Sequence, residues 1–539
     1  MRRWNGWGDD QFNLELPANG AAFLAERIGR ARPLADATLA SVVARVPETR
    51  LPPHDKLTTK VATDAETRVR HARGQSLADW LAMHSGEFGV FPDGVAFPEN
   101  SEDARELLEW AAQTNAVVIP YGGGTSVAGH INPNQSDRPV LTISLARMNR
   151  LLDLDYQSHI ATFGAGTPGP LLEAQLKAEG YTLGHFPQSF ELSTIGGWVA
   201  SRSSGQQSLR YGRIEQLFAG GRMETPRGSL IIPTIPASSA GPDIREMIMG
   251  SEGRMGLITE VRVRITPLPE KEAFHVIFFP DWASARDASR SLVQSRVQVS
   301  MIRVSNPAET ETQLALAGHE KLIGALEKFL GFRGLADGKC MMTLGLTGSK
   351  TQCHAALKEV RRTCKSHSGV YTGTHMGRKW AAKRFTMPYL REALWEMGYA
   401  VDTLETATDW DNVDNMINRV EENLRNGLSE EGEPVHVFTH LSHFYTQGCS
   451  IYTTYVFRAA GDYATTLARW QKLKQSTSRL IVENRGTISH QHGVGKDHAP
   501  YLPVEKGELG MQAIRSLCDL FDPEARLNPG TLLQEDSRP

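Results

Sequence analysis

The segment Ile119-Pro120-Tyr121-Gly122-Gly123-Gly124-Thr125-Ser126-Val127 decides the fold class. A β-rich run from Ala116 leads into it, and Asn100-Ser101 can cap a helix that precedes this run. Helix, strand and glycine loop in this order indicate a mixed α/β chain. Consecutive glycines let backbone N–H groups converge on an anion, and Thr125 and Ser126 add hydroxyl donors. The loop has neither the GxGxxG spacing of a nicotinamide-binding turn nor the lysine of a P-loop, so it fits another kind of diphosphate. Alone, it could equally be a flexible turn.

Two further glycine-rich segments follow the first, all within about 140 residues. The first of these supplies Gln188, Ser189, Ser193, Thr194, Gly196 and Gly197, followed by Ser201 and Ser204, and the second supplies Glu252, Gly253, Gly256 and Ile258. Three segments rich in main-chain donors fit one large phosphate-bearing cofactor whose flat ring is also lined by backbone. They could be three separate turns, but their density disfavours this.

The pattern along the chain predicts four parts: an N-terminal extension over 1–85, a cofactor-binding domain over 86–270, a second α/β domain over 271–470 and a C-terminal segment over 471–539. In the second part, a strand over 141–145 and a helix over 168–177 follow the same pattern as the helix and strand before the glycine loop. A strand over 256–265 then ends at Thr266-Pro267. The third part has a strand over 275–279 and a helix over 415–426, without glycine loops, and we expect it to form the substrate side. An amphipathic stretch over 509–520 lies in the tail.

Composition excludes several classes of protein. With 58 Lys+Arg against 61 Asp+Glu and 40% hydrophobic residues, neither a basic nucleic-acid surface nor disorder is indicated. No run of about 18 apolar residues and no apolar signal core is present, so we expect a cytoplasmic protein without a transmembrane segment. Five scattered cysteines without a CxxC pair predict reduced thiols.

Histidines cluster in two places. His490 and His492 in the tail are two residues apart, so on an extended segment they face the same way, and Gly493 and Gly495 allow backbone to approach a ring. In the second cluster His436 and His440 would share a strand face that His443 opposes, so a zinc site would need a turn between them. We therefore predict no metal, two partly exposed histidines, and His443 near the active site.

The motifs taken together resemble a known superfamily over nearly the whole chain. They are Trp4–Gly8, the glycine loop, Phe190–Gly205, Gly241–Ile244 and Ser489–Lys496. These resemble the vanillyl-alcohol oxidase/p-cresol methylhydroxylase type of FAD-binding domain, and within it the alkyldihydroxyacetonephosphate synthase family. The resemblance implies a two-part FAD-binding domain with an α/β cap. It also places the diphosphate on Gly122–Val127 and the flavin ring beside Ser193–Thr194 and Gly253–Ile258. Since Gly122–Thr125 contains no histidine and His130 lies well past the loop, we expect non-covalent FAD.

The resemblance also implies an activity. Members of this family exchange the acyl group of an acyl-dihydroxyacetone phosphate for a fatty alcohol at a flavin adduct, with no net redox change. It implies catalytic roles for Tyr452, as acid/base, and for His490, His492 and Arg303, and substrate binding by Arg391, which holds phosphate, and by His443.

One departure keeps alternatives open. The family has three consecutive histidines where this chain has His490-Gln491-His492, and an amide cannot take up a proton as imidazole does. The ending Asp522-Pro523 with Asn528-Pro529-Gly530 looks more like FAD-dependent D-2-hydroxyacid dehydrogenases, although the metal-binding motif of that branch, with its Gly-Asp-Gly core, is absent. A hydroxy-acid or alcohol dehydrogenase is therefore the alternative, and a non-catalytic FAD scaffold is a third hypothesis.

For partners, we expect a small-molecule or lipid-like substrate, no nucleic acid and a homodimer, with peripheral contact to a membrane left open.

Overall fold

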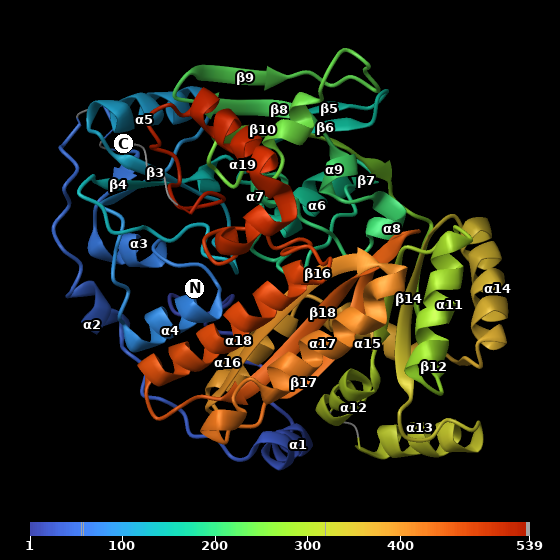
Figure 1. Ribbon diagram of the computed structural model, residues 1–539. Coiled ribbons are helices and arrows are strands. Elements are labelled where there is room, and N and C mark those ends of the chain that lie inside the picture. Colours follow the sequence, from blue (N-terminus) through green and yellow to red (C-terminus); the bar gives the residue numbers. More distant parts are fainter. Residues whose placement is uncertain (55, 58, 318–319, 535–539) are drawn as a thin grey trace.

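The computed structural model describes residues 1–54, 56–57, 59–317 and 320–534. Within these ranges the strands form three large sheets and a small two-stranded one, β11 (Thr266–Pro267) with β7 (Tyr181–Thr182). Figure 1 shows two of the large sheets in one half of the molecule and the third in the other half.

The first sheet carries the glycine loop. Its order is β1 (Val61–Ala62), β2 (Gly94–Ala96), β4 (Val140–Ser144) and β3 (Val117–Tyr121), and β3 runs parallel to β4. The preceding helix α5 (Ser101–Gln113) starts at Asn100, whose side chain accepts a hydrogen bond from the N–H of Asp103 as an N-cap should. β3 ends at Tyr121, so the glycines begin at the carboxyl end of a parallel strand, where ligands bind in open α/β sheets.

The second sheet is antiparallel and continues the same half. Its order is β5 (Leu151–Asp155), β6 (Ile160–Gly164), β10 (Leu257–Arg264), β8 (Phe218–Thr225) and β9 (Gly228–Ile232). Around it lie α6 (Gly169–Ala178), α7 (Ile195–Ser201), α8 (Ser208–Tyr211), α9 (Ile214–Leu217) and α10 (Ile244–Ile248). The second glycine segment leads into α7 and the third leads into β10, so both meet the loop after β3.

The third sheet is antiparallel throughout and forms the cap. Its order is β15 (Val370–Gly373), β12 (Lys271–Phe279), β14 (Cys340–Gly348), β13 (Met301–Ser305), β17 (His436–Phe444), β18 (Gly448–Arg458) and β16 (Tyr399–Asp409). Along β12 alternate residues join different cores: Ile277 and Phe279 one, Val276 and Phe278 the other. Both faces of this sheet are therefore covered.

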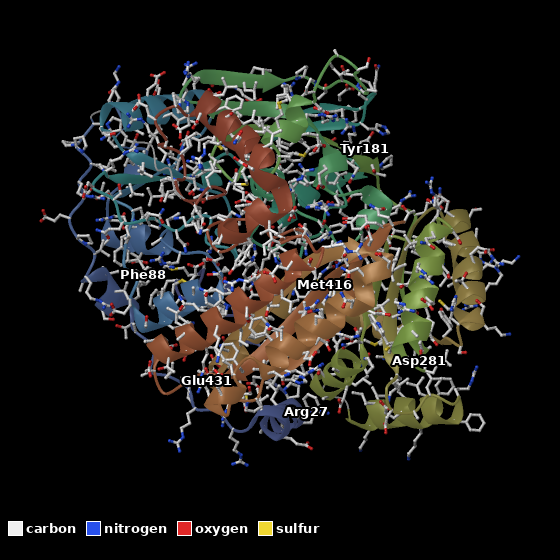
Figure 2. The ribbon with its side chains drawn as sticks, viewed as in Figure 1. Arg27, Phe88, Tyr181, Asp281, Met416 and Glu431 are labelled. Carbon is white, nitrogen blue, oxygen red and sulfur yellow. The ribbon has the colours of Figure 1, made fainter. Side chains whose placement is uncertain are left out.

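The helices of the cap pack on these two faces. They are α11 (Trp282–Gln294), α12 (Pro307–Leu316), α13 (Glu320–Phe332), α14 (Lys350–Ser366), α15 (His375–Lys383), α16 (Leu390–Trp395), α17 (Val413–Asn426) and α18 (Tyr463–Glu483). Figure 2 shows Met416 of α17 directed into the interior, where it is fully buried, while Arg27 and Glu431 project from the surface.

Residues 1–85 do not stand apart from the rest. They form α1 (Ala18–Ile28), α2 (Leu39–Val43), α3 (Ala65–Arg70) and α4 (Leu77–Ser85). Trp7 and Trp80 belong to the same hydrophobic core as the cap residues Leu404 and Tyr455. The expected extension is thus divided between the two halves, because β1 and Leu57 belong to the half with the first sheet, and the sequence pattern did not indicate this.

The tail returns to the first half of the molecule. Helix α19 (Leu502–Phe521) contributes Cys518 to the core of that half, and a parallel bridge joins Leu527 to Val118 of β3. Figure 1 shows α19 lying across the FAD-side sheets.

The predicted elements agree with these bounds to within a few residues, and the expected stretch over 509–520 is the part of α19 that follows an interruption at Gly507. No helix among the described residues is long and apolar enough to cross a bilayer. The domain limits at residues 86, 271 and 471 stay predictions.

Candidate active site

A cavity of about 180 Å³ lies where the three glycine segments meet. The predicted cofactor-binding residues that line it are Pro120, Tyr121, Gly122, Gly123, Gly124, Thr125, Ser126, Val127, Ser189, Ser193, Thr194, Gly196, Gly197, Ser201, Glu252, Gly253, Gly256 and Ile258. Of the other two, Gln188 lines a neighbouring cavity and Ser204 lines neither, because its side chain is buried beneath the segment. We refer to this first space as the FAD cavity.

The close packing and chemistry of the FAD cavity suit a hydrogen-bonding ligand. A Cβ on Gly123 would stand 1.9 Å from the carbonyl oxygen of Leu192, and one on Gly122 would stand 2.6 Å from the hydroxyl of Thr194. The loop therefore packs against the second segment so closely that only glycine fits. The buried side-chain oxygen of Asn528 lines the cavity without a partner among the described residues, so a hydrogen-bonding ligand has a place to bind.

His130, which sequence reasoning placed beyond the loop, also lines the FAD cavity. Its Nδ1 contacts the hydroxyl of Ser126, and its Nε2 lies 3.1 Å from a carboxylate oxygen of Glu252. Burial disfavours charge on His130, but the carboxylate of Glu252 outweighs burial and raises the pKa of the imidazole. Glu252 also accepts hydrogen bonds from the backbone N–H groups of Val494 and Gly495, at 2.5 and 2.6 Å. It thereby ties the tail to the glycine loop.

A second cavity, of about 310 Å³, adjoins the first. The residues common to both linings are Thr125, Val127, Ser189, Ser203, Gln491 and His492. On the far side its walls come from the cap and from Trp7, Gln75 and Trp80 of the N-terminal part. We call this the substrate cavity, since it opens on the FAD cavity at the tail motif.

Arg391 brings an uncompensated positive charge to the substrate cavity. Its guanidinium lies 4.2 Å from the ring of Trp80 and donates one hydrogen bond, of 2.5 Å, to the carbonyl of Gln75. Nε and Nη2 are buried and have no partner in the described part of the chain. Burial lowers the pKa of Arg391, yet a guanidinium stays charged at ordinary pH. Two buried N–H groups on a cation that lines a cavity are suited to hold an anion.

Arg303 lines the same cavity but its charge is balanced. Its Nη2 lies 2.5 Å from Glu309 and 3.1 Å from Nδ1 of His440. Burial alone would favour the neutral acid, but His440 and Arg303 together lower the pKa of Glu309 to about 2. The charge of Arg303 is therefore paired with a buried carboxylate, in contrast to that of Arg391, although Nε of Arg303 has no partner in the described part of the chain.

Tyr452 lies at the centre of the cap wall. Strand register places Glu405 of β16 and His440 of β17 directly beside it, and the rings of Tyr452 and His440 stack at 4.8 Å. Burial raises the pKa of the Tyr452 hydroxyl, which keeps its proton. The ring of His492 stands edge-on to Tyr452, with 6.0 Å between centroids. Burial lowers the pKa of His492 more than the carboxylate of Glu405 raises it, so the imidazole is neutral and can accept a proton.

Glu405 holds the tail motif in place. Its carboxylate lies 3.1 Å from Nδ1 of His490, 2.6 Å from Nε2 of Gln491 and 3.6 Å from Nε2 of His492. Burial would raise the pKa of Glu405, but the histidines around it, His490 first, hold the pKa below its usual range. Of the three tail residues, Gln491 and His492 line the FAD and substrate cavities and His490 does not.

Two predicted placements need correction. His490 is turned away from both cavities toward Glu405, and His443 packs behind it, with 4.9 Å between the ring centroids and no place in either lining. Direct contact of either side chain with substrate is therefore not what this geometry offers. His436 and His440 are 8% and 5% exposed rather than partly exposed, because α1 and α12 cover their face of β17.

Some candidate residues escaped sequence reasoning altogether. Glu405 and Glu309 are buried, and no local pattern marks them, because their contacts with His490 and His440 join residues at least 85 positions apart. Gln75 carried no local signal either, since Arg391 lies 316 positions away. Trp7 belongs to the motif Trp4–Gly8, but its contact with Glu392, 385 positions away, could not be foreseen.

Comparison with known proteins agrees with this site. The "FAD binding domain" family matches residues 92–232, and the "FAD linked oxidases, C-terminal domain" family matches residues 268–532. An alkyldihydroxyacetonephosphate synthase of Dictyostelium discoideum is 31% identical over 88% of this chain and 79% of its own length. The chain belongs to the alkyldihydroxyacetonephosphate synthase family. It is an FAD-dependent enzyme.

Further members of the synthase family extend the match to nearly the full chain. One of Trypanosoma brucei brucei is 28% identical over 98% of this chain and 92% of its own length. A solved structure of an alkyldihydroxyacetonephosphate synthase superposes with a TM-score of 0.83 at 26% identity, covering 98% of both chains. The expected fold, an FAD-binding domain with an α/β cap, is confirmed.

Proposed function

We propose that this protein exchanges the acyl group of an acyl-dihydroxyacetone phosphate for a fatty alcohol. The observation that carries the proposal is Arg391, a buried cation with two free N–H groups on the wall of a cavity that adjoins the FAD cavity. A phosphate group would satisfy Arg391 by accepting hydrogen bonds from both of these N–H groups. Arg303 lines the same wall, but Glu309 already balances its charge.

The rest of the substrate cavity suits an alkyl chain. Its apolar lining consists of Leu24, Leu316, Met387, Leu390, Leu394, Val401, Phe438 and Val456. These residues come from α1, α12, η2 (Met387–Tyr389), α16, β16, β17 and β18, so the apolar wall extends away from the FAD side. One cavity thus offers an anion site and an apolar wall, which a phosphate-bearing lipid requires together.

Proton transfer falls to His492, with Tyr452 as a hydrogen-bond donor. When the acyl group leaves as a carboxylate and the alcohol oxygen forms the new ether bond, the alcohol proton must be taken up. His492 is neutral, and since its Nε2 faces Glu405, its Nδ1 is the atom we assign as acceptor. Tyr452 keeps its proton and donates a hydrogen bond to the departing carboxylate. When bound, FAD supplies the ring at which the exchange takes place.

Gln491 favours a second candidate function. The amide cannot titrate, and it lies where both cavities meet, bound to Glu405. If proton transfer at that place is indispensable for the exchange, the same site would instead oxidise a hydroxy acid, with Arg391 holding the carboxylate and His492 taking the hydroxyl proton.

The test is a turnover assay on the FAD-loaded protein with palmitoyl-dihydroxyacetone phosphate and deuterated hexadecanol, without oxygen. We expect a deuterated alkyl-dihydroxyacetone phosphate by mass spectrometry and no net loss of the oxidised flavin band. A parallel series of assays with D-2-hydroxy acids tests the alternative function, oxidation of a hydroxy acid. Bleaching by one of these acids, with no ether product, would replace the synthase function by the dehydrogenase.

Two further expectations belong to the proposal. The five cysteines are all buried, and the cytoplasmic location is a prediction that fractionation of cells would test. The homodimer is a prediction that light scattering after gel filtration would test.

A further inference from the structure

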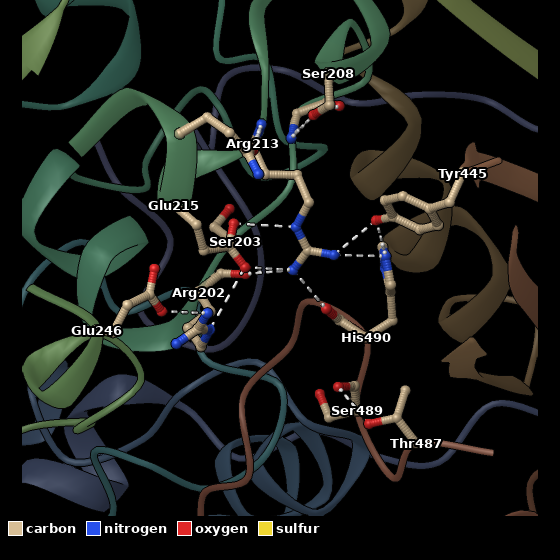
Figure 3. A network of polar contacts seen from close by, with 12 residues as sticks. Arg202, Ser203, Ser208, Arg213, Glu215, Glu246, Tyr445, Thr487, Ser489 and His490 are labelled. Carbon is tan, nitrogen blue, oxygen red and sulfur yellow. Dashed lines mark hydrogen bonds and ion pairs between the residues drawn. The ribbon is translucent and has the colours of Figure 1, made fainter. Parts of the chain in front are cut away.

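Arg213, just before α9, lies at the centre of a polar network behind the tail motif (Figure 3). Its guanidinium donates to the hydroxyl of Tyr445 at 2.7 Å and contacts Nε2 of His490 at 2.9 Å. It also donates to the carbonyls of His490 and Arg202, each at 3.1 Å, and pairs with Glu215 at 3.0 Å. The side chain is 16% exposed, so it is largely desolvated. Each of the three guanidinium nitrogens has a partner.

The directions of these hydrogen bonds fix the tautomer of His490. A guanidinium can only donate, so Nε2 of His490 must be an acceptor. The Tyr445 hydroxyl accepts from Arg213 and lies 2.7 Å from the same Nε2, so its own hydrogen points there. Nε2 therefore carries no hydrogen. The hydrogen of the neutral imidazole is on Nδ1, which faces Glu405 at 3.1 Å.

This tautomer determines what Glu405 presents to the active site. One carboxylate oxygen accepts from His490, and the other remains for Gln491 at 2.6 Å and His492 at 3.6 Å. In the opposite tautomer a lone pair of His490 would face the fully buried carboxylate, which would lose a donor. Gln491 and His492 line both cavities, so a change at His490 would reach the chemistry through Glu405.

The titratable and charged groups that surround His490 come from several elements of the fold. They are Arg213, Tyr445, Glu405, His443 and His492, with Glu215 behind Arg213. Glu405, His443 and His490 bring potential ligand atoms within 4.8 Å of one another. However, Nε2 of His490 accepts hydrogen bonds from Arg213 and Tyr445, and Nδ1 donates to Glu405, so His490 has no lone pair left for a cation.

We infer that Arg213 and Tyr445 are positioning residues that lock His490 in its Nδ1–H tautomer and, through Glu405, hold Gln491 and His492 in the reactive arrangement. The inference rests on the proposed function for its kinetic consequence but not for the tautomer itself. His490 is then a positioning residue too, in place of the catalytic role that the sequence suggested.

The tautomer can be read directly and without turnover. Long-range ¹H–¹⁵N spectra of protein labelled with ¹⁵N-histidine distinguish the two ring nitrogens, and His490→Asn assigns the signals by their loss. We expect the Nδ1–H form in the wild-type protein. Arg213→Met, in which the Tyr445 hydroxyl becomes free to accept, should produce Nε2–H or mixed His490 signals, and the double variant Arg213→Met/Tyr445→Phe should do the same. Tyr445→Phe alone should keep the Nδ1–H form, because Arg213 still donates to Nε2. Nε2–H in the wild type, or no change in both the Arg213→Met and the double variant, would overturn the inference.

Kinetics provide the second readout. Asparagine places an N–H where Nδ1–H stood but has no tautomer to lose, so His490→Asn provides a background in which the lock is absent. Arg213→Met should lower kcat about tenfold to a hundredfold, as the loss of supporting hydrogen bonds around a site generally does, with KM little changed. In the His490→Asn background the same substitution should cost less than threefold. Arg202→Gln, which removes an exposed neighbour that does not touch His490, is the matched control.

The outcomes separate the two claims. Absence of exchange activity in the wild type, with the Nδ1–H tautomer present, would overturn the proposed function and leave the lock intact. Exchange activity with equal losses for Arg213→Met in both backgrounds would show that Arg213 acts by general structural support, and would overturn the lock.

Discussion

Replacing Arg391 by Met removes the buried cation but keeps a side chain of similar length against Trp80. Two N–H groups, at Nε and Nη2, are free for a ligand. A hydrogen bond to a charged group contributes about 1.5–3 kcal/mol, so two contribute about 3–6 kcal/mol. At about 1.4 kcal/mol per tenfold, kcat/KM for a phosphate-bearing substrate should fall by about two to four orders of magnitude.

The assay compares two substrates, acyl-dihydroxyacetone phosphate and the same ester without phosphate. Wild-type protein should prefer the phosphate, and Arg391→Met should lose that preference while changing little on the other ester. Equal losses on both esters, or a retained preference, would refute the assignment of Arg391 to phosphate.

Thermal stability provides a control on the same variant. Because Arg391 has no ion pair in the described residues, Met in its place should leave the melting temperature unchanged or raise it. Arg303→Met should lower the melting temperature instead, since it removes one of the two partners, Arg303 and His440, that face the buried carboxylate of Glu309. A strong destabilisation by Arg391→Met would show that the cation is already compensated in the free protein.

Further predictions follow from single contacts. Glu309 has its pKa lowered from 4.5 to about 2 by His440 and Arg303 against the effect of burial, so the stability it contributes is present above pH 4.5 and is lost as the pH falls toward 2; acid unfolding should show a weaker pH dependence in Glu309→Gln, and an unchanged one would contradict the ion pair. Gly123→Ala should abolish FAD binding, because its Cβ would stand 1.9 Å from a backbone carbonyl, whereas Gly461→Ala, with open space around it, should bind FAD normally in a flavin-fluorescence titration. Denaturation in acid should release all the flavin, since both ring nitrogens of His130 are engaged, and flavin fluorescence left on the protein band would show a covalent bond. Gln491→His should keep or raise exchange turnover. Loss of turnover in this variant would argue against the catalytic role that the family resemblance implies for the tail motif.

The parts of the fold that sequence predicted are those with local signals. Asn100 caps α5 through its neighbour Asp103, and the glycines of the loop are required by contacts that any residue with a Cβ would block. Hydrophobic periodicity and helix capping depend on residues a few positions apart, so a single sequence reveals them.

The parts that escaped depend on distant partners. Glu405 is 85 positions from His490, and Arg213 is 277 positions from it, so no pattern along the chain joins them. The exposure of His440 was mispredicted because alternation along β17 does not reveal that helices cover both faces of the cap sheet. The same limit applies to residues 1–85, whose contacts include α16 and the cap core.

The central claim, exchange without net oxidation beside a flavin, is tested most directly by a single turnover with hexadecanol labelled with ¹⁸O in its hydroxyl group. The account predicts that the alkyl product carries the ¹⁸O, that the released fatty acid carries none, and that the flavin ends oxidised. An alkyl product without the ¹⁸O, which would mean that the C–O bond of the alcohol breaks, or a flavin left reduced, would contradict it.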